Sequence, residues 1–259
     1  MKPVFILIGL ISIAVAVPGQ TNLLKLADFE SGDLSQIRTQ KAQTDSLTVV
    51  TAPVRAGKFA ARTLLRASDP KVAKGQRAEF SDGGKTTLVE MEKDYWYGLS
   101  IFIPDDFVAP TNSDAVLFQW HTQQGGPSPV LAIRVQAGEW VITSNATEKR
   151  RTLGTVPFAK NRWTDWVVHV RWSAAHKGFW TVWKDGVEVV NERDVVTQYP
   201  EALGPYAKFG QYHSVNKTAQ NIVYFDEYRV AGPDGSYAAV APPNGPAPKD
   251  KAARPTGSR

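Results

Sequence analysis

The sequence predicts an all-β protein built as a two-sheet antiparallel β-sandwich. Short apolar runs rich in Val, Ile, Trp, Phe and Tyr alternate with turn clusters between about residues 21 and 231. The turn clusters include Asp82-Gly83-Gly84 and Gly125-Gly126-Pro127. Long segments with a 3.6-residue apolar period are missing. This rhythm of short strands and turns is typical of a sandwich.

The clearest local unit of the predicted sandwich runs from Trp163 to Val190. It contains two alternating stretches, Trp166–Trp172 and Phe179–Trp183, followed by Asp185-Gly186 and a third short apolar stretch. An Asp-Gly pair between alternating segments is a strong hairpin signal. We therefore expect consecutive antiparallel strands here.

The two ends of the sequence differ in composition from its middle. Residues 1–17 combine Lys2 with an apolar stretch and small residues, which is typical of a signal peptide. Residues 21–231 form the expected β domain, and residues 232–259, rich in Pro, Ala and Gly, are predicted to be a disordered tail. The apolar stretch is shorter than the roughly 20 residues that span a membrane. We expect a secreted protein, extracellular or periplasmic, without a membrane anchor.

Composition excludes several classes of function. With 0 cysteines the chain has no disulfide framework and no thiolate nucleophile. The net charge of +5 favours anionic partners only weakly. The absence of a basic run or a known nucleic-acid motif argues against nucleic acid as the partner.

Alternation along the predicted strands separates a core side from a polar side. If Phe118 and Trp120 are buried, Gln119 and His121 point the other way, because successive side chains of a strand face opposite sides. The same reasoning places Arg134 and Gln136 on the polar side of the stretch 131–136.

Three further stretches contribute side chains to this expected polar face, namely Arg77, His169 with Arg171, and Lys208 with Tyr212. The alternative explanation is that these side chains only contact solvent, since polar and apolar residues also alternate in a sheet with one face in water. Solvent faces usually carry Lys, Glu, Thr and Ser, however, and this set of His, Gln, Arg and Tyr is unusual for solvation alone.

At these residues the chain resembles the polysaccharide lyases with a jelly-roll fold, related to glucuronan lyase and more distantly to heparin lyase I. The resemblance covers most of residues 21–231 and rests on the order and spacing of several motifs. These are Arg77-Ala-Glu79, Tyr95–Pro104, Gln119-Trp-His121, Trp166–Trp172 with the hairpin that follows, Lys208–Tyr212 and Tyr224-Phe-Asp226. It implies a concanavalin-like β-jelly roll.

The resemblance also implies β-elimination on a uronic acid sugar of glucuronan or alginate type. A base removes the C5 proton, a neutralising group stabilises the enolate-like intermediate, and an acid protonates the leaving O4. The expected catalytic residues are Tyr212, His121 and Gln119, and the sequence leaves open which of Tyr212 and His121 abstracts the proton. The residues expected to bind the anionic polysaccharide are Arg77, Arg134, His169, Arg171, Lys208 and Gln136.

The resemblance implies no cofactor for the chemistry, but relatives often carry a structural calcium ion. Glu30, Asp33 and Asp226 are the candidate oxygen ligands in this sequence. We expect a monomer.

Two rival functions stay open. A non-catalytic carbohydrate-binding module would also present aromatic and cationic side chains, although binding alone needs no proton-transfer groups. A glycoside hydrolase needs a pair of carboxylates across the cleft. The strand pattern of closely spaced acids is absent, and Glu79 has no evident partner in the sequence.

Overall fold

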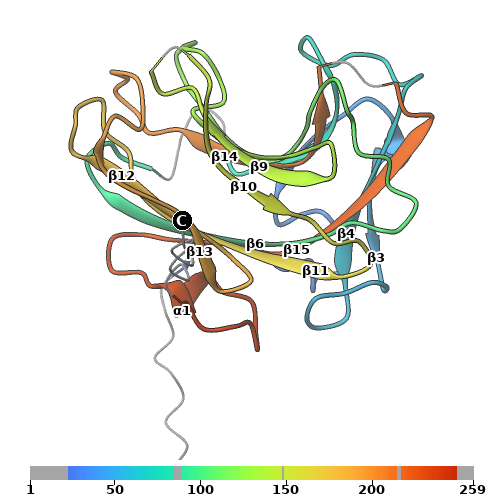
Figure 1. Ribbon diagram of the computed structural model, residues 1–259. Helices are drawn as coiled ribbons and strands as arrows, with labels where there is room; N and C mark the ends of the chain where they lie inside the picture. The colour runs from blue at the N-terminus through green and yellow to red at the C-terminus, as the bar shows by residue number, and fades with distance from the viewer. Residues whose placement is uncertain (1–22, 84–88, 148, 215–216, 250–259) are drawn as a thin grey trace, which may run out of the picture.

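The computed structural model describes residues 23–83, 89–147, 149–214 and 217–249. Two antiparallel sheets pack face to face and both are curved (Figure 1). We call them the back sheet, on the convex side, and the cleft sheet, on the concave side. The all-β sandwich predicted from the sequence is confirmed.

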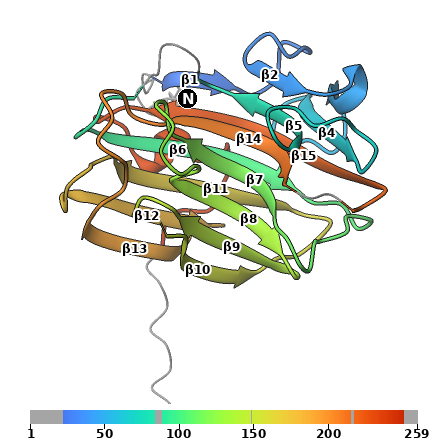
Figure 2. The ribbon, with the colours of Figure 1, turned by 90° about the horizontal axis from the view of Figure 1, so that it is seen from above.

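The back sheet runs in the order β13 (Val187–Val195), β12 (Gly178–Lys184), β11 (Trp163–Arg171), β6 (Asp94–Phe102), β15 (Gln220–Ala231), β4 (Ala60–Arg66) and β3 (Leu47–Val50), with β1 (Leu23–Ala27) paired to β15. The cleft sheet runs in the order β10 (Arg151–Pro157), β9 (Glu139–Ser144), β8 (Leu131–Gln136), β7 (Ala115–His121), β14 (Tyr206–His213), β5 (Gln76–Ser81) and β2 (Arg38–Lys41), as Figure 2 shows from above. One 3₁₀ turn, Thr44–Ser46, precedes β3.

The predicted hairpin lies where the sequence placed it. Strands β11, β12 and β13 are consecutive neighbours in the back sheet. Asp185 and Gly186 both have positive φ, 50° and 78°. Two successive positive φ values are what a type I′ turn requires, and its twist matches that of the flanking strands.

Aromatic side chains from both sheets fill the space between them. The rings of Trp140 on β9 and Trp166 on β11 meet edge to face, with centroids 5.2 Å apart. Trp120 on β7 lies against Tyr97 on β6, 5.2 Å away. Such contacts across the interface hold the two sheets together and send the alternate side chains of β7 outward.

The segment after β15 differs from the prediction of a disordered tail. Residues 232–249 lie on the convex face of the back sheet and include the short helix α1 (Tyr237–Val240) (Figure 1). Val240 is buried with Tyr237 against Val167 of β11. The prediction fails here because it weighed only the apolar content of the tail, whereas the sheet itself supplies an apolar outer surface for the tail to cover.

Close approach of this segment depends on a glycine in the sheet. A Cβ atom at Gly98 of β6 would lie 1.8 Å from the carbonyl oxygen of Val240.

The expected signal peptide, residues 1–17, and residues 250–259 of the expected tail lie outside the described residues. Among the described helices, none is long and apolar enough to span a membrane.

Candidate active site

The concave face of the cleft sheet gathers most of the polar side chains that alternation predicts. They come from three adjacent strands: Arg77 and Glu79 from β5, Gln119 and His121 from β7, and Lys208 and Tyr212 from β14. Strand register pairs Lys208 with Gln119 and Tyr212 with Arg77. Residues far apart in the sequence thus become neighbours on one face.

Glu79 lies at the centre of this group and is 1% exposed. Its Oε1 accepts a hydrogen bond from Gln119 Nε2 at 2.5 Å. Its Oε2 accepts hydrogen bonds from Lys208 Nζ at 2.5 Å and Arg77 Nη1 at 3.1 Å. One carboxylate therefore orients an amide and two cations, and the three charges leave an excess of one positive charge.

Gln40, on the edge strand β2, is a second acceptor in this network and contacts the same two cations as Glu79. Its Oε1 accepts hydrogen bonds from Lys208 Nζ at 2.8 Å and from Arg77 Nη1 at 3.3 Å. Burial lowers the pKa of Lys208, whereas the adjacent Glu79 carboxylate raises it. The ammonium and guanidinium groups are thus held in fixed positions by two acceptors.

His121 is oriented with one ring nitrogen toward the backbone. Its Nδ1 lies 2.9 Å from the carbonyl oxygen of Thr122. A carbonyl only accepts, so Nδ1 carries the proton of the neutral ring, and Nε2 keeps its lone pair. Burial lowers the pKa of His121, and the nearby cations Lys208 and Arg77 also lower it. No described residue forms a hydrogen bond with Nε2, and a neutral imidazole in this arrangement is suited to act as a general base.

Tyr212 is held between a guanidinium group and a glycine. The Arg77 Cζ atom lies 4.6 Å from the centre of the Tyr212 ring, a cation–π arrangement. On the loop before β5, a Cβ atom at Gly75 would lie 2.3 Å from Cε2 of the Tyr212 ring. Gly75 thus provides the space that the ring of Tyr212 occupies.

A bulge in β14 sets the spacing between Lys208 and Tyr212. The register of β14 against β7 shifts between Phe209 and Tyr212. Gly210, within this bulge, has φ = 132°, and a Cβ atom there would lie 2.3 Å from the carbonyl oxygen of Ala78. Only glycine fits this backbone and this close approach.

Arg134 lies on β8 and is 3% exposed. Its Nη1 bonds to Asp114 at 2.9 Å and its Nε to Thr143 at 2.8 Å, while no described residue forms a hydrogen bond with its buried Nη2. Asp114 also binds Arg150 at 2.9 Å. Gln136 lies at the end of β8 opposite Glu139, and no hydrogen bond among the described residues links it to Glu79 or its partners.

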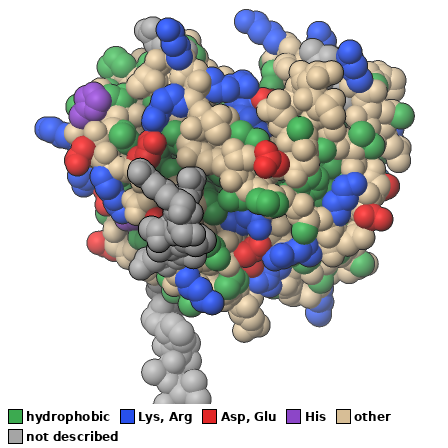
Figure 3. Space-filling view, viewed as in Figure 1, with side chains coloured by type: hydrophobic (Ala, Val, Ile, Leu, Met, Phe, Trp, Pro, Cys, Tyr) green, Lys and Arg blue, Asp and Glu red, His purple; other side chains and the backbone are tan. Residues whose placement is uncertain are grey.

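A cleft of about 520 Å³ opens beside this network. Its lining includes His121, Lys208, Gln40, Arg38 and Tyr206. The Tyr206 ring lies 5.2 Å from the ring of His121. Figure 3 shows the notch in this side of the molecule, with basic side chains at its base. Tyr212 and Arg77 share the concave face but lie beside this cleft rather than in its lining.

Two predicted members of the polar face lie elsewhere, and their prediction is wrong. His169 and Arg171 belong to β11, which lies in the back sheet between β6 and β12. His169 stacks on Trp96 with ring centroids 3.7 Å apart, and Arg171 bonds to Asp94 at 2.8 Å. Alternation correctly turned both side chains away from the core, but it does not reveal which sheet a strand joins.

The three expected calcium ligands do not converge. Glu30 Oε1 accepts backbone hydrogen bonds from Lys58 and Phe59, and Asp226 Oδ2 accepts them from Arg55 and Ala56, so both carboxylates bind the loop 55–59. Asp33 instead bonds to Ser31 and Ser35 in its own turn. Within the described ranges no group of three or more His, Cys, Asp or Glu is arranged to hold a metal ion. Glu30 and Asp226 fit a cation only with added backbone carbonyl oxygens, and Asp33 does not fit.

Three residues of the site were missed from the sequence: Glu79 as the centre of the network, Gln40 and Tyr206. Glu79 stands two positions after Arg77, so alternation already placed the two on one side. Its other partners, Gln119 and Lys208, are 40 and 129 positions away. Gln40 lies in a short polar strand without alternating apolar residues. Such a stretch cannot be recognised as a strand from hydrophobic periodicity.

A profile of the family described as polysaccharide lyase matches residues 29–229. The chain belongs to the polysaccharide lyase family. The family resemblance drawn from the motifs is thereby confirmed. No curated protein sequence matches the lyase significantly.

Solved structures share the fold of this lyase at low sequence identity. Endo-β-1,4-glucuronan lyase from the fungus Trichoderma reesei has a TM-score of 0.70 at 16% identity, over 85% of this chain and 98% of that chain. Alginate lyase A1-II′, a member of polysaccharide lyase family 7, has a TM-score of 0.59 at 13% identity, over 77% and 94%. The cellulose induced protein Cip1 has a TM-score of 0.57 at 16% identity, over 80% and 96%.

Proposed function

We propose that this lyase cleaves a uronic-acid polysaccharide of glucuronan or alginate type by β-elimination on the concave face of the cleft sheet. The observation that carries the proposal is the neutral ring of His121, whose Nε2 has no hydrogen-bond partner among the described residues, beside the buried network centred on Glu79. A general base next to fixed positive charge is what removal of a proton beside a carboxylate requires.

The reaction divides into three roles for these residues. His121 Nε2, or the oxygen of Tyr212 as the deprotonated phenolate, takes the C5 proton, and the C–H electron pair forms the C4–C5 double bond. The bond from C4 to O4 breaks, and the acid partner returns a proton to O4. Gln119, with Arg77 and Arg134, binds the uronate carboxylate as its charge builds up in the transition state. Which of His121 and Tyr212 is the base depends on the epimer at C5.

The oriented cations support an anionic substrate. Lys208 and Arg77 share one carboxylate, so the floor of the site keeps a positive charge after internal pairing. The names of two structurally similar proteins, a glucuronan lyase and an alginate lyase, point to the same substrate class. Residues 1–17 support export, which would bring the enzyme to such polymers.

The cleft gives less support to the rival functions. No Asp or Glu is among the described residues that line it, whereas a hydrolase needs two carboxylates there. A binding module has no use for a desolvated imidazole with a free Nε2.

The decisive experiment is to incubate the protein with glucuronan, alginate and a heparin-type substrate and follow the ultraviolet absorbance of the unsaturated uronate. β-Elimination on glucuronan or alginate raises this absorbance together with reducing ends. Reducing ends without the absorbance would identify a hydrolase, and binding without either would identify a binding module. Both of these results would overturn the proposal.

A further inference from the structure

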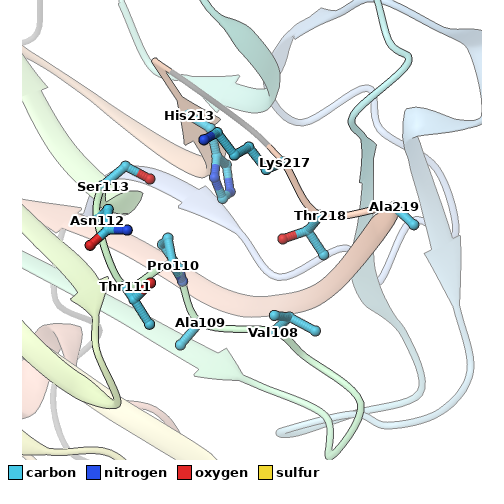
Figure 4. A pocket seen from close by; sticks show the side chains of 10 residues that line it. All are labelled: Val108, Ala109, Pro110, Thr111, Asn112, Ser113, His213, Lys217, Thr218 and Ala219. Carbon is cyan, nitrogen blue, oxygen red and sulfur yellow. The ribbon is translucent and has the colours of Figure 1, made fainter.

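A second cavity lies apart from the cleft, between the segment 108–113 before β7 and the segment 217–219 before β15 (Figure 4). Its volume is about 590 Å³. Small-molecule sites usually measure about 300–1,000 Å³ and are mostly apolar, with a few polar groups that fix the ligand. This cavity shares no lining residue with the cleft among the described residues.

His213 supplies the most informative polar group in this cavity. The side chain is 1% exposed, and its Nε2 has no hydrogen-bond partner among the described residues. Figure 4 shows the ring pointing into the space between the two segments. An unpaired buried nitrogen costs free energy unless something binds it, so this position calls for a ligand atom.

The charge of the cavity comes from Lys217. Burial lowers the pKa of His213 to about 4, so its ring is uncharged near neutral pH. The Asp114 carboxylate, which interacts electrostatically with His213, is paired with Arg134 and Arg150. Lys217 is thus the one charged group in the described lining, and it is exposed and forms no ion pair with another described residue. The positive charge of Lys217 therefore favours an anionic ligand.

The shape of the lining determines the rest of the ligand. Val108, Ala109 and Pro110 form one wall, and Ala219 lies on the other. No Trp, Tyr or Phe ring is available for stacking on a sugar among the described lining residues.

We propose that this cavity binds a small organic carboxylate with a compact apolar body, whose oxygens contact the Lys217 ammonium and accept a hydrogen bond from Nε2–H of His213. The apolar body lies against Val108, Ala109 and Pro110. This site is independent of the proposed cleavage reaction, because none of its groups acts in the cleft.

The test uses benzoate as the probe and benzamide, its uncharged isostere, titrated into the full chain by calorimetry. We expect benzoate to bind and benzamide to bind at least tenfold more weakly. Lys217→Ala should weaken benzoate at least tenfold. Lys177→Ala, which removes another exposed lysine from the loop between β11 and β12, should leave the affinity unchanged.

A second variant and a second ligand keep the result interpretable. His213→Phe keeps a ring of similar size and should weaken benzoate also, while Tyr212→Phe should not change its affinity. Equal binding of benzoate and benzamide would overturn the proposal, as would an unchanged affinity in Lys217→Ala. Tighter binding of glucuronate than of benzoate would refute the apolar body. Loss of benzoate binding in Tyr212→Phe would place the ligand at the active site instead.

Discussion

Glu79 accepts a 2.5 Å hydrogen bond from Lys208, and the two side chains are 1% and 3% exposed. A buried ion pair contributes little net stability, because both charges lose their hydration on folding. The ion pair instead fixes side-chain positions, because the same carboxylate also accepts hydrogen bonds from Gln119 and Arg77. The pair thus fixes the groups that face the substrate.

Glu79→Gln should lower both the stability and the activity. The substitution leaves the Lys208 and Arg77 charges buried without a carboxylate, and we expect the free energy of unfolding to fall by about 3 kcal/mol. Urea denaturation measures the stability, and the absorbance assay measures kcat. Glu139→Gln, at an exposed position on β9, is the matched control. A Glu79→Gln variant as stable and active as the wild type would show that the network has no orienting role.

Tyr212→Phe should reduce kcat by about 10²- to 10⁴-fold, the usual contribution of a proton-transfer group. The ring, its contact with Arg77 and the fold stay in place, so circular dichroism and substrate retention should be unchanged. Tyr206→Phe is the informative comparison, because Tyr206 lines the cleft beside His121. Burial raises the pKa of Tyr206, which disfavours it as a base. A larger loss in Tyr206→Phe than in Tyr212→Phe would move the tyrosine role to Tyr206.

The pH profile should report His121. Its pKa is lowered from its ordinary value of 6.5, chiefly by burial. The neutral base therefore persists to lower pH, and kcat/KM should fall only as the pH drops through a value below 6.5. Lys208→Met removes a charge that lowers the pKa of His121, so the acidic limb should move to higher pH.

Initial rates between pH 4 and 9 measure this limb, and Lys177→Met controls for loss of a distant charge. An acidic limb above pH 6.5, or one that stays in place in Lys208→Met, would contradict the assignment of His121 as the titrating base.

Gly75→Ala should impair catalysis through Tyr212 alone. The new methyl group would lie 2.3 Å from the Tyr212 ring, so the ring must shift from its present position beside Arg77. We expect kcat to fall at least tenfold with the absorbance assay. Gly232→Ala is the control, because a Cβ atom there meets nothing closer than Leu24 at 3.5 Å. Full activity in Gly75→Ala would mean that the position of the Tyr212 ring is not critical.

Local periodicity explains what was predictable from the sequence. Gln119, His121, Arg77, Lys208 and Tyr212 each alternate with buried neighbours, and that pattern is sufficient to turn each of them away from the core. The family motifs then related these residues to a reaction. Strands, turns and the hairpin at Asp185-Gly186 followed from the same short-range signals.

Pairing between distant segments explains what was not predictable. His169 has the same alternation as His121, but β11 pairs with β6 in the back sheet. The partners of Glu79 depend on β14 lying between β5 and β7. The order of the C-terminal segment depends on the surface of a sheet that is complete only after folding. None of these long-range contacts can be recognised from the few residues that flank each position in the sequence.

The C-terminal segment also bears on self-association. Strand β13 is an edge of the back sheet, and an unpaired edge is a template for pairing with another copy of the chain. Lys249 forms a parallel bridge to Val187 there: its N–H donates to the Gly186 carbonyl at 2.7 Å, and its carbonyl accepts from Glu188 N at 3.1 Å. Lys249 thus occupies backbone groups at the start of this edge strand, and these groups are not available for pairing with a strand of another copy.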